Sequence, residues 1–138
     1  MIHISKIRKG RAGALHNAAA RLNVASIYIV GPPNGRPVKI GVANDIRKRL
    51  TDFNIAHWDP IVSHYICPIG RLGPYCFTIE KAIHAELKKQ GKHLRGEWFD
   101  LEASEALKVV ERFRAEMVPD EEKAKIRQLE ALLRGQNP

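Results

Sequence analysis

The chain has 138 residues, of which 44% are hydrophobic, and this length suffices for one domain with its own apolar core. Its apolar runs are too short to cross a bilayer, and no apolar segment of a secretory signal follows the basic N-terminus, so neither a membrane protein nor a secreted protein is expected. The formal net charge of +8 and the pI near 9.8 favour a polyanionic partner.

Residues 1–24 form the first predicted element, a basic arm with five Lys and Arg side chains and no acidic one. Residues 1–100 have a charge balance of +9, whereas residues 101–138 have a balance of −1. We therefore expect nucleic acid as the partner, with an acidic membrane surface as an alternative. The side chains expected to contact nucleic acid are Lys6, Arg8, Lys9, Arg11 and Lys48.

Apolar periodicity and turn residues predict the elements that follow the arm. The predicted strands cover residues 25–31, 37–42 and 60–69, and residues 96–101 form a short extended piece. The predicted helices cover residues 44–54, with Asn44 or Asp45 as the cap, and residues 75–90, 102–117 and 119–134.

Asn34-Gly35 predicts a hairpin between the first two strands, because a type I′ turn needs positive φ at both central residues. Position i then faces position 69 − i, so Tyr28 lies opposite Gly41 and shares its face with Lys39, a diagonal neighbour about 7–8 Å away. Taken singly, Tyr28 is an ordinary strand aromatic and Lys39 a lysine that extends to water. As a pair on one face, they are candidate site residues.

Arg49 is set apart from its basic neighbours on the predicted helix 44–54. On a helical wheel it lies at the edge of the apolar stripe, about 60° from Ile46, whereas Arg47 and Lys48 point away. Its guanidinium is suited to bidentate binding of a phosphate, and pairing with a carboxylate at the edge of the core is the equal alternative.

Glu80 falls near the middle of the apolar stripe predicted for residues 75–90, and His84 follows one turn later. A carboxylate in that position is costly unless it is paired or holds a metal ion. The alternatives are a buried salt bridge to Arg49 or Arg95 and the coordination of one Mg²⁺ or Mn²⁺ ion. The apolar members of the stripe are Cys76, Phe77, Ile83 and Leu87.

The remaining segments point to ordinary packing. Cys67 and Cys76 are too few for a disulfide framework, so two buried thiols in a reducing cytoplasm are expected. The helices predicted at 102–117 and 119–134 carry apolar residues at helical spacing. These helices are expected to cover the domain, with a homodimer interface as the alternative.

Together these motifs resemble the signatures of the GIY-YIG nuclease superfamily, in its phage- and bacterium-associated branch. The residues that carry the resemblance are Tyr28, Lys39-Ile40-Gly41, Asp45, Arg49-Leu50, Glu80, His84 and Gly96-Glu97-Trp98-Phe99. Ser26 and Lys39 stand where that family has Gly and its second Tyr, and Val42 replaces a frequent basic residue.

The resemblance implies an α+β fold, with a small three-stranded antiparallel sheet flanked by helices. Residues 25–101 would form the nuclease domain and residues 102–138 a helical extension that packs on it. It also implies a cytoplasmic protein encoded by a bacterium, phage or mobile element.

The activity implied is phosphodiester hydrolysis with one Mg²⁺ or Mn²⁺ ion, on DNA in preference to RNA. Glu80 would be the metal ligand, and Arg49 would bind the scissile phosphate. Tyr28 would act as general base or orient the attacking water, Lys39 would lower the pKa of Tyr28 or of the water, and His84 would assist. The competing hypothesis is a non-catalytic DNA-binding module on the same scaffold.

Overall fold

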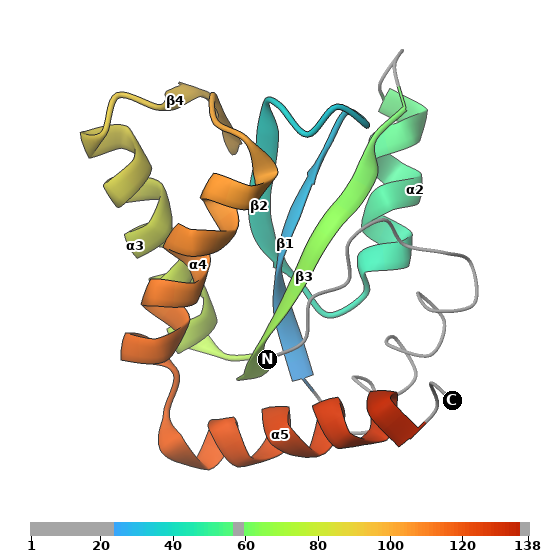
Figure 1. Ribbon diagram of the computed structural model, residues 1–138, viewed down its shortest axis with the longest axis vertical. Coiled ribbons are helices and arrows are strands. Elements are labelled where there is room, and N and C mark those ends of the chain that lie inside the picture. The colour runs from blue at the N-terminus through green and yellow to red at the C-terminus, as the bar shows by residue number, and fades with distance from the viewer. Residues whose placement is uncertain (1–23, 57–59, 136–138) are drawn as a thin grey trace.

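The computed structural model describes residues 24–56 and 60–135 of the chain (Figure 1). Their central feature is an antiparallel sheet of five strands in the order β3-β1-β2-β5-β4. The strands are β1 (Val24–Gly31), β2 (Val38–Ala43), β3 (Val62–Arg71), β4 (His93–Arg95) and β5 (Trp98–Phe99). The helices are α2 (Ile46–Ala56), α3 (Pro74–Lys89), α4 (Ala103–Met117) and α5 (Asp120–Gly135).

The α+β architecture is confirmed, but the expectation of a three-stranded sheet was wrong. Strands β4 and β5 extend the sheet beyond β2, and Gly96, at φ +55°, lies in the turn between them. Both strands are too short for an alternating pattern, and all three residues of β4 are exposed. Only the extended character of residues 98–99 was therefore readable from the sequence.

The β1–β2 hairpin has the predicted register. Tyr28 pairs with Gly41, and Val30 pairs with Lys39. The tight turn is shifted, because the Gly35 N–H donates to the Pro32 carbonyl at 2.9 Å, which makes Asn34 the third residue of the turn rather than the second. The connecting residues, 32–37, are even in number, so the parity that places Tyr28 and Lys39 on one face is preserved.

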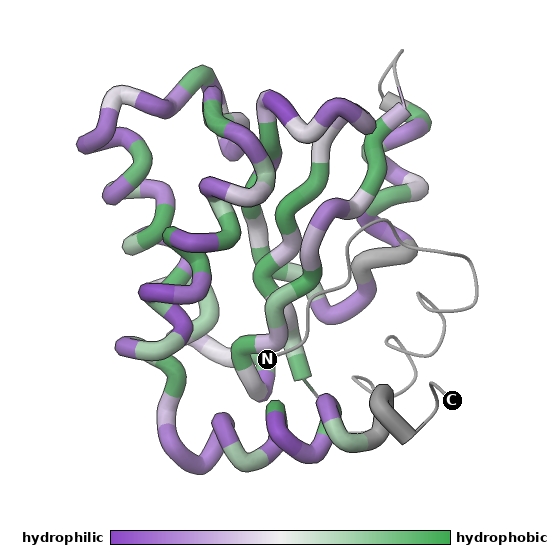
Figure 2. Tube along the Cα trace, in the orientation of Figure 1, coloured by the Kyte–Doolittle hydropathy of each residue, from purple (hydrophilic) through white to green (hydrophobic). Residues whose placement is uncertain are grey.

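Helices cover both faces of the sheet, with α3 and α4 on one side and α2 on the other (Figure 1). The α3/α4 face buries a large cluster of aliphatic residues that includes Ile27, Ile40 and Ile83. The α2 face buries a smaller cluster around Tyr28, with Phe53 of α2 packed against it. Figure 2 shows the corresponding concentration of hydrophobic residues along the strands.

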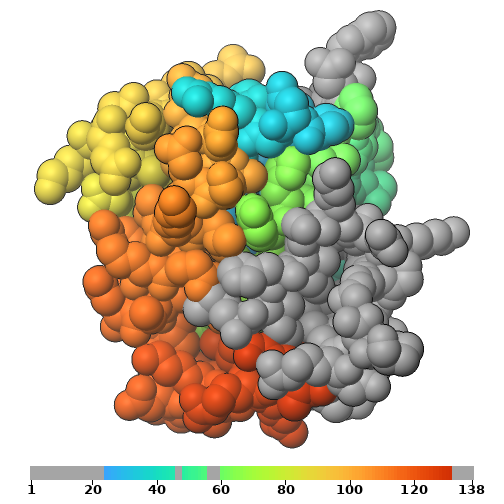
Figure 3. Space-filling model, in the orientation of Figure 1, coloured from blue at the N-terminus to red at the C-terminus, as the bar shows by residue number. Residues whose placement is uncertain are grey.

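The two C-terminal helices pack onto the sheet. Helix α4 contributes Ala106 and Val110 to the α3/α4 cluster, while α5 runs across the end of the sheet and places Ile126 and Leu129 in different clusters. Figure 3 shows α4 and α5 forming adjoining parts of one surface. Arg114 of α4 is only 4% exposed and lies 3.5 Å from Glu111.

Two further expectations concern buried residues. Cys67 and Cys76 are both buried free thiols, as expected, and burial raises the pKa of Cys67 to about 12. Phe77 was wrongly assigned to the buried stripe of α3, since it is 49% exposed and Ile79 is buried instead. In residues 24–56 and 60–135, none of the helices is long and apolar enough to span a membrane.

Candidate functional site

The candidate site is centred on Gly41 of β2, where Tyr28 of the neighbouring strand lies across the glycine. A Cβ atom at Gly41 would collide with the Tyr28 hydroxyl oxygen, so only glycine leaves room for this ring. Tyr28 is 1% exposed, and its ring packs against Phe53 of α2 with the two centroids 5.8 Å apart. The predicted pairing of Tyr28 with Gly41 thus brings the ring over a residue that has no side chain.

Glu97 joins the two residues that the hairpin register brings together. The Tyr28 hydroxyl donates to Glu97 Oε2 at 3.1 Å, and Lys39 Nζ lies 3.9 Å from the same oxygen. The Ile40 N–H donates to the Glu97 carbonyl at 3.1 Å and so fixes the Glu97 backbone beside β2. Tyr28, Lys39 and Glu97 therefore form one connected polar cluster.

Glu80 and His84 bind the edge of β2 that β5 leaves unpaired. The Val42 N–H donates to Glu80 Oε2 at 2.9 Å, and His84 Nε2 donates to the Ile40 carbonyl at 2.8 Å. Glu80 and His84 are four residues apart on one face of α3, and the Val42 N–H and the Ile40 carbonyl are two residues apart on one edge of β2. These two spacings match, so each side chain reaches one backbone group. The helix thus supplies the hydrogen bonds that another strand would make.

The structure places Glu80 at the margin of the buried stripe, where it is half-buried. Within the described residues, it makes a salt bridge with neither Arg49 nor Arg95, the two partners considered from the sequence. Its Oε1 oxygen accepts no hydrogen bond there, so one oxygen of the carboxylate is available to a ligand.

Arg49 is exposed at the rim of the cluster, with its guanidinium carbon 6.0 Å from the Phe53 ring centroid. In the part of the chain that the structure describes, no carboxylate lies within salt-bridge distance of it. Lys39 Nζ lies 4.8 Å from the same ring centroid, so two cations flank Phe53.

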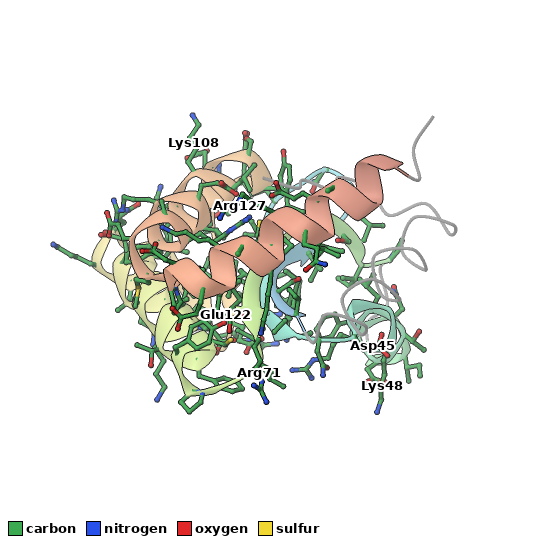
Figure 4. The ribbon with its side chains drawn as sticks, turned by 90° about the horizontal axis from the view of Figure 1, so that it is seen from below. Asp45, Lys48, Arg71, Lys108, Glu122 and Arg127 are labelled. Carbon is green, nitrogen blue, oxygen red and sulfur yellow. The ribbon has the colours of Figure 1, made fainter. Side chains whose placement is uncertain are left out.

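A surface groove of about 320 Å³ adjoins the cluster between the beginnings of α2 and α3. Arg49, Lys48 and the exposed Phe77 are among its lining residues. The N-terminus of α2 is capped as predicted, because the Lys48 N–H donates to Asp45 Oδ1 at 3.2 Å. Figure 4 shows the Asp45 and Lys48 side chains on the outer side of α2.

The charges of the cluster act on one another. The pKa of Glu80 is raised, first by burial and then by the charge of Glu97, while His84, the Val42 N–H and Arg49 act in the opposite direction. The pKa of the Tyr28 phenol is also raised, first by burial and then by Glu97. The lowering of the Tyr28 pKa that was expected from Lys39 is therefore not found.

The predicted site residues Tyr28, Lys39, Arg49, Glu80 and His84 all lie around Gly41. The site also includes Glu97, to which the sequence motifs gave no role. In the sequence, Glu97 is visible only as a charged residue directly before a Trp-Phe strand. Its partners in the fold, Tyr28 and Lys39, lie 69 and 58 residues away along the chain. The arm residues Lys6, Arg8, Lys9 and Arg11 lie outside the described residues.

The carboxylates of the site do not form a closed metal centre by themselves. Within residues 24–56 and 60–135, no three His, Cys, Asp or Glu side chains gather in a group that could hold a metal ion. An ion at Glu80 would thus need water and phosphate oxygens as most of its ligands, which is the usual arrangement for Mg²⁺ at phosphate sites.

The fold and the site define a small α+β domain with a polar cluster where the β1–β2 hairpin meets α3. The model of the T5orf172 domain family matches residues 25–114, which is well over half of the chain. The chain belongs to the T5orf172 domain family, which is associated with nuclease-like and DNA-binding domains. Comparison with curated proteins and with solved structures gave no significant match.

This match corrects the family expected from the sequence motifs. The T5orf172 domain is a different family from the GIY-YIG nuclease superfamily, so that assignment was wrong. The short motifs were too degenerate to separate families, because KIG-type triplets and isolated Glu or His residues recur in unrelated folds. The matched region includes most of α4, which the sequence analysis had placed in the C-terminal extension.

Proposed function

We propose that this domain is a DNA endonuclease that hydrolyses phosphodiester bonds with one divalent metal ion. The family, the charge of +8 and the polar cluster around Gly41 support this proposal. The observation that carries it is the combination of a half-buried Glu80 with a free carboxylate oxygen and an exposed Arg49 without a carboxylate partner among the described residues. A phosphodiester at this position would meet a site for a cation and a guanidinium together.

Glu80 is the residue that would hold the ion. Its Val42 hydrogen bond fixes Oε2 and leaves Oε1 as a hard oxygen donor, which suits Mg²⁺ or Mn²⁺. A second carboxylate, Glu97, lies near enough for its charge to raise the Glu80 pKa, so a bound cation would relieve this repulsion. The ion would neutralise charge on the phosphate and favour departure of the leaving oxygen.

The other residues of the cluster would bind and orient the substrate. Arg49 would clamp two phosphate oxygens, and its charge is held in place beside Phe53. Lys48 lies next to it in the groove and would contact a neighbouring phosphate. His84 donates to the Ile40 carbonyl, so it would hold α3 and Glu80 in register with β2.

A non-catalytic DNA-binding module is the second candidate. The observation in its favour is that Glu80 and His84 already have a complete structural role at the unpaired edge of β2. Under this alternative the cluster stabilises the fold, and Arg49 and Lys48 bind the DNA backbone without cleavage.

The two candidates differ in a plasmid assay. We expect the full chain to nick supercoiled plasmid at low salt with Mg²⁺ or Mn²⁺ and to lose this activity in EDTA. Arg49→Ala is expected to lower the cleavage rate about 100-fold, as removal of a group that stabilises developing charge does. Lys48→Ala, one residue away and also exposed, is the matched control and should lower it less than tenfold.

Plasmid that is retarded on a gel but never cut, with either metal ion, would favour the binding module. In that case Arg49→Ala and Lys48→Ala should weaken binding by similar factors, because each removes one phosphate contact.

A further inference from the structure

The Tyr28 hydroxyl is poorly placed to take a proton from an attacking water. Tyr28 is 1% exposed, and its hydroxyl hydrogen is already donated to Glu97 Oε2 at 3.1 Å. On the other side of the hydroxyl lies the Gly41 backbone, so close that a single added methyl group would collide with the oxygen. At 1% exposure, the Tyr28 side chain offers almost no surface to water.

Glu97 has the accessibility that Tyr28 lacks. Its side chain is 34% exposed, and both polar contacts, from Tyr28 and from Lys39, are made to Oε2. Its Oε1 accepts no hydrogen bond from the described residues. The Ile40 N–H binds its main-chain carbonyl and fixes the Glu97 backbone beside β2, while Tyr28 and Lys39 hold the carboxylate. One carboxylate oxygen is thus oriented by two partners while the other is open.

Tyr28 and Lys39 are themselves held firmly. The Tyr28 ring packs against Phe53, and Lys39 lies between the rings of Phe53 and Trp98, at 4.8 and 5.9 Å from their centroids. Tyr28 cannot move far without disrupting the packing of the α2 face, because it is 1% exposed. Both are arranged to fix the orientation of a carboxylate.

We propose that Glu97 is the general base of the hydrolysis, and that Tyr28 and Lys39 are positioning residues that orient its carboxylate. This inference rests on the proposed function and replaces the role of base that the sequence suggested for Tyr28. The raised pKa of the Tyr28 phenol supports it, since a phenol that holds its proton more tightly is a donor rather than a base.

A water molecule near Glu97 Oε1 gives its proton to that oxygen while its own oxygen forms a bond to phosphorus. The bond between phosphorus and the leaving sugar oxygen breaks, and the sugar oxygen takes a proton from solvent. The products are a phosphate monoester and a sugar hydroxyl, and Glu97 then releases its proton to solvent.

The test compares Glu97→Gln with Tyr28→Phe in single-turnover cleavage of a labelled duplex, with the dissociation constant for DNA measured separately. Glu97→Gln keeps an oxygen that accepts from Tyr28 but is not a base, and we expect its rate to fall 100-fold or more. Tyr28→Phe removes only the orienting hydrogen bond, and we expect a loss of less than tenfold. Both variants should bind DNA within threefold of the wild type and show its circular dichroism.

The opposite ranking, with Tyr28→Phe the slower variant, would overturn the assignment. So would a Mg²⁺ concentration for half-maximal rate raised more than tenfold in Glu97→Gln, because Glu97 would then be a metal ligand. Failure of the proposed function is distinguishable, since the wild type itself would then cut no DNA under any metal condition. A wild type that cuts, with Glu97→Gln equally active, refutes the assignment of the base alone.

Discussion

On the face covered by α3 and α4, the sheet buries aliphatic side chains together with Cys67 and Phe99, whereas the face beneath α2 carries Tyr28, Lys39 and Trp98. The first face follows the ordinary rule that apolar area removed from water stabilises the fold. On the second face, an aromatic ring is buried so that its hydroxyl meets Glu97, and a lysine is kept between two aromatic rings. Both polar groups have partners within the site, so this face combines packing with a fixed arrangement of charged groups.

The unpaired edge of β2 is where the two faces meet. Glu80 and His84 reach this edge from α3, while Glu97 reaches it from the turn before β5. The apolar face sets the position of α3, and α3 in turn places Glu80 against the site. Variants on the two faces should consequently separate stability from chemistry.

Leu87→Ala on the α3/α4 face should have the largest effect on stability. Leu87 is fully buried, so the substitution removes apolar contacts and leaves a cavity. We expect a loss of about 2–5 kcal/mol in the free energy of unfolding, measured in urea. Ile55→Ala is the matched control, because Ile55 is 81% exposed and its loss should be within about 0.5 kcal/mol. Equal losses for the two variants would contradict the assignment of the core.

Gly41→Ala should have the next largest effect, and it should lower both stability and cleavage. The new methyl group collides with the Tyr28 hydroxyl, so the ring must move and its hydrogen bond to Glu97 must break. We expect about 1–3 kcal/mol of lost stability from overpacking, together with reduced cleavage. Gly73→Ala, where a Cβ meets no atom closer than 3.9 Å, is the control, and it should cost only about 0.5–1 kcal/mol, because alanine is a poorer helix N-cap than glycine, and leave cleavage unchanged.

Glu80→Gln should change the pH dependence of stability. Because the folded-state pKa of Glu80 is raised, folding favours the protonated form, and the wild type loses stability as pH rises from about 4.5 through the raised pKa. The Gln variant still accepts from Val42 and has no charge to lose. It should be more stable than the wild type at pH 7, with the difference vanishing below pH 4.5.

Urea denaturation at several pH values, without metal ions, measures this effect. Glu80→Ala serves as the control, because it removes the acceptor for the Val42 N–H and should be less stable than Glu80→Gln at every pH. A Gln variant that is less stable than the wild type at pH 7 would contradict the raised pKa.

Arg36→Gln should have the smallest effect. Arg36 Nε lies 2.8 Å from Asp100 Oδ1 at the surface, and this partner lowers the pKa of Asp100. The pair contributes stability above the ordinary Asp pKa near 3.8, and the contribution is lost as pH falls through the lowered value. We expect a slight fall in the urea midpoint that disappears in 1 M salt, since exposed pairs are screened. A fall that persists in high salt would indicate a packing role instead.

The sequence predicted the hairpin and its consequences well. Asn34-Gly35 located the connection, and an even loop preserved the register that pairs Tyr28 with Gly41, even though the tight turn itself is shifted. Long periodic helices were also readable, because α4 and α5 repeat their apolar residues over four turns. The residue ranges of these two helices follow from those patterns.

The remaining features depend on contacts between distant residues. Strands β4 and β5 have too few residues for a pattern of their own, and β5 pairs with β2 some 60 residues away. The wheel placed Glu80 in the buried stripe but could not show that Val42 would be its partner. The place of Glu97 beside Tyr28 likewise required the folded sheet.

The most direct test of the account is the cleavage of supercoiled plasmid by Glu80→Gln beside the wild type, both with Mg²⁺ and both shown to be folded. We expect the variant to retain the fold and DNA binding, while its cleavage rate falls at least 100-fold. The reason is that the Gln oxygen no longer carries the charge that holds the ion. A folded Glu80→Gln variant that cuts plasmid at the wild-type rate would contradict the proposal that Glu80 serves the reaction.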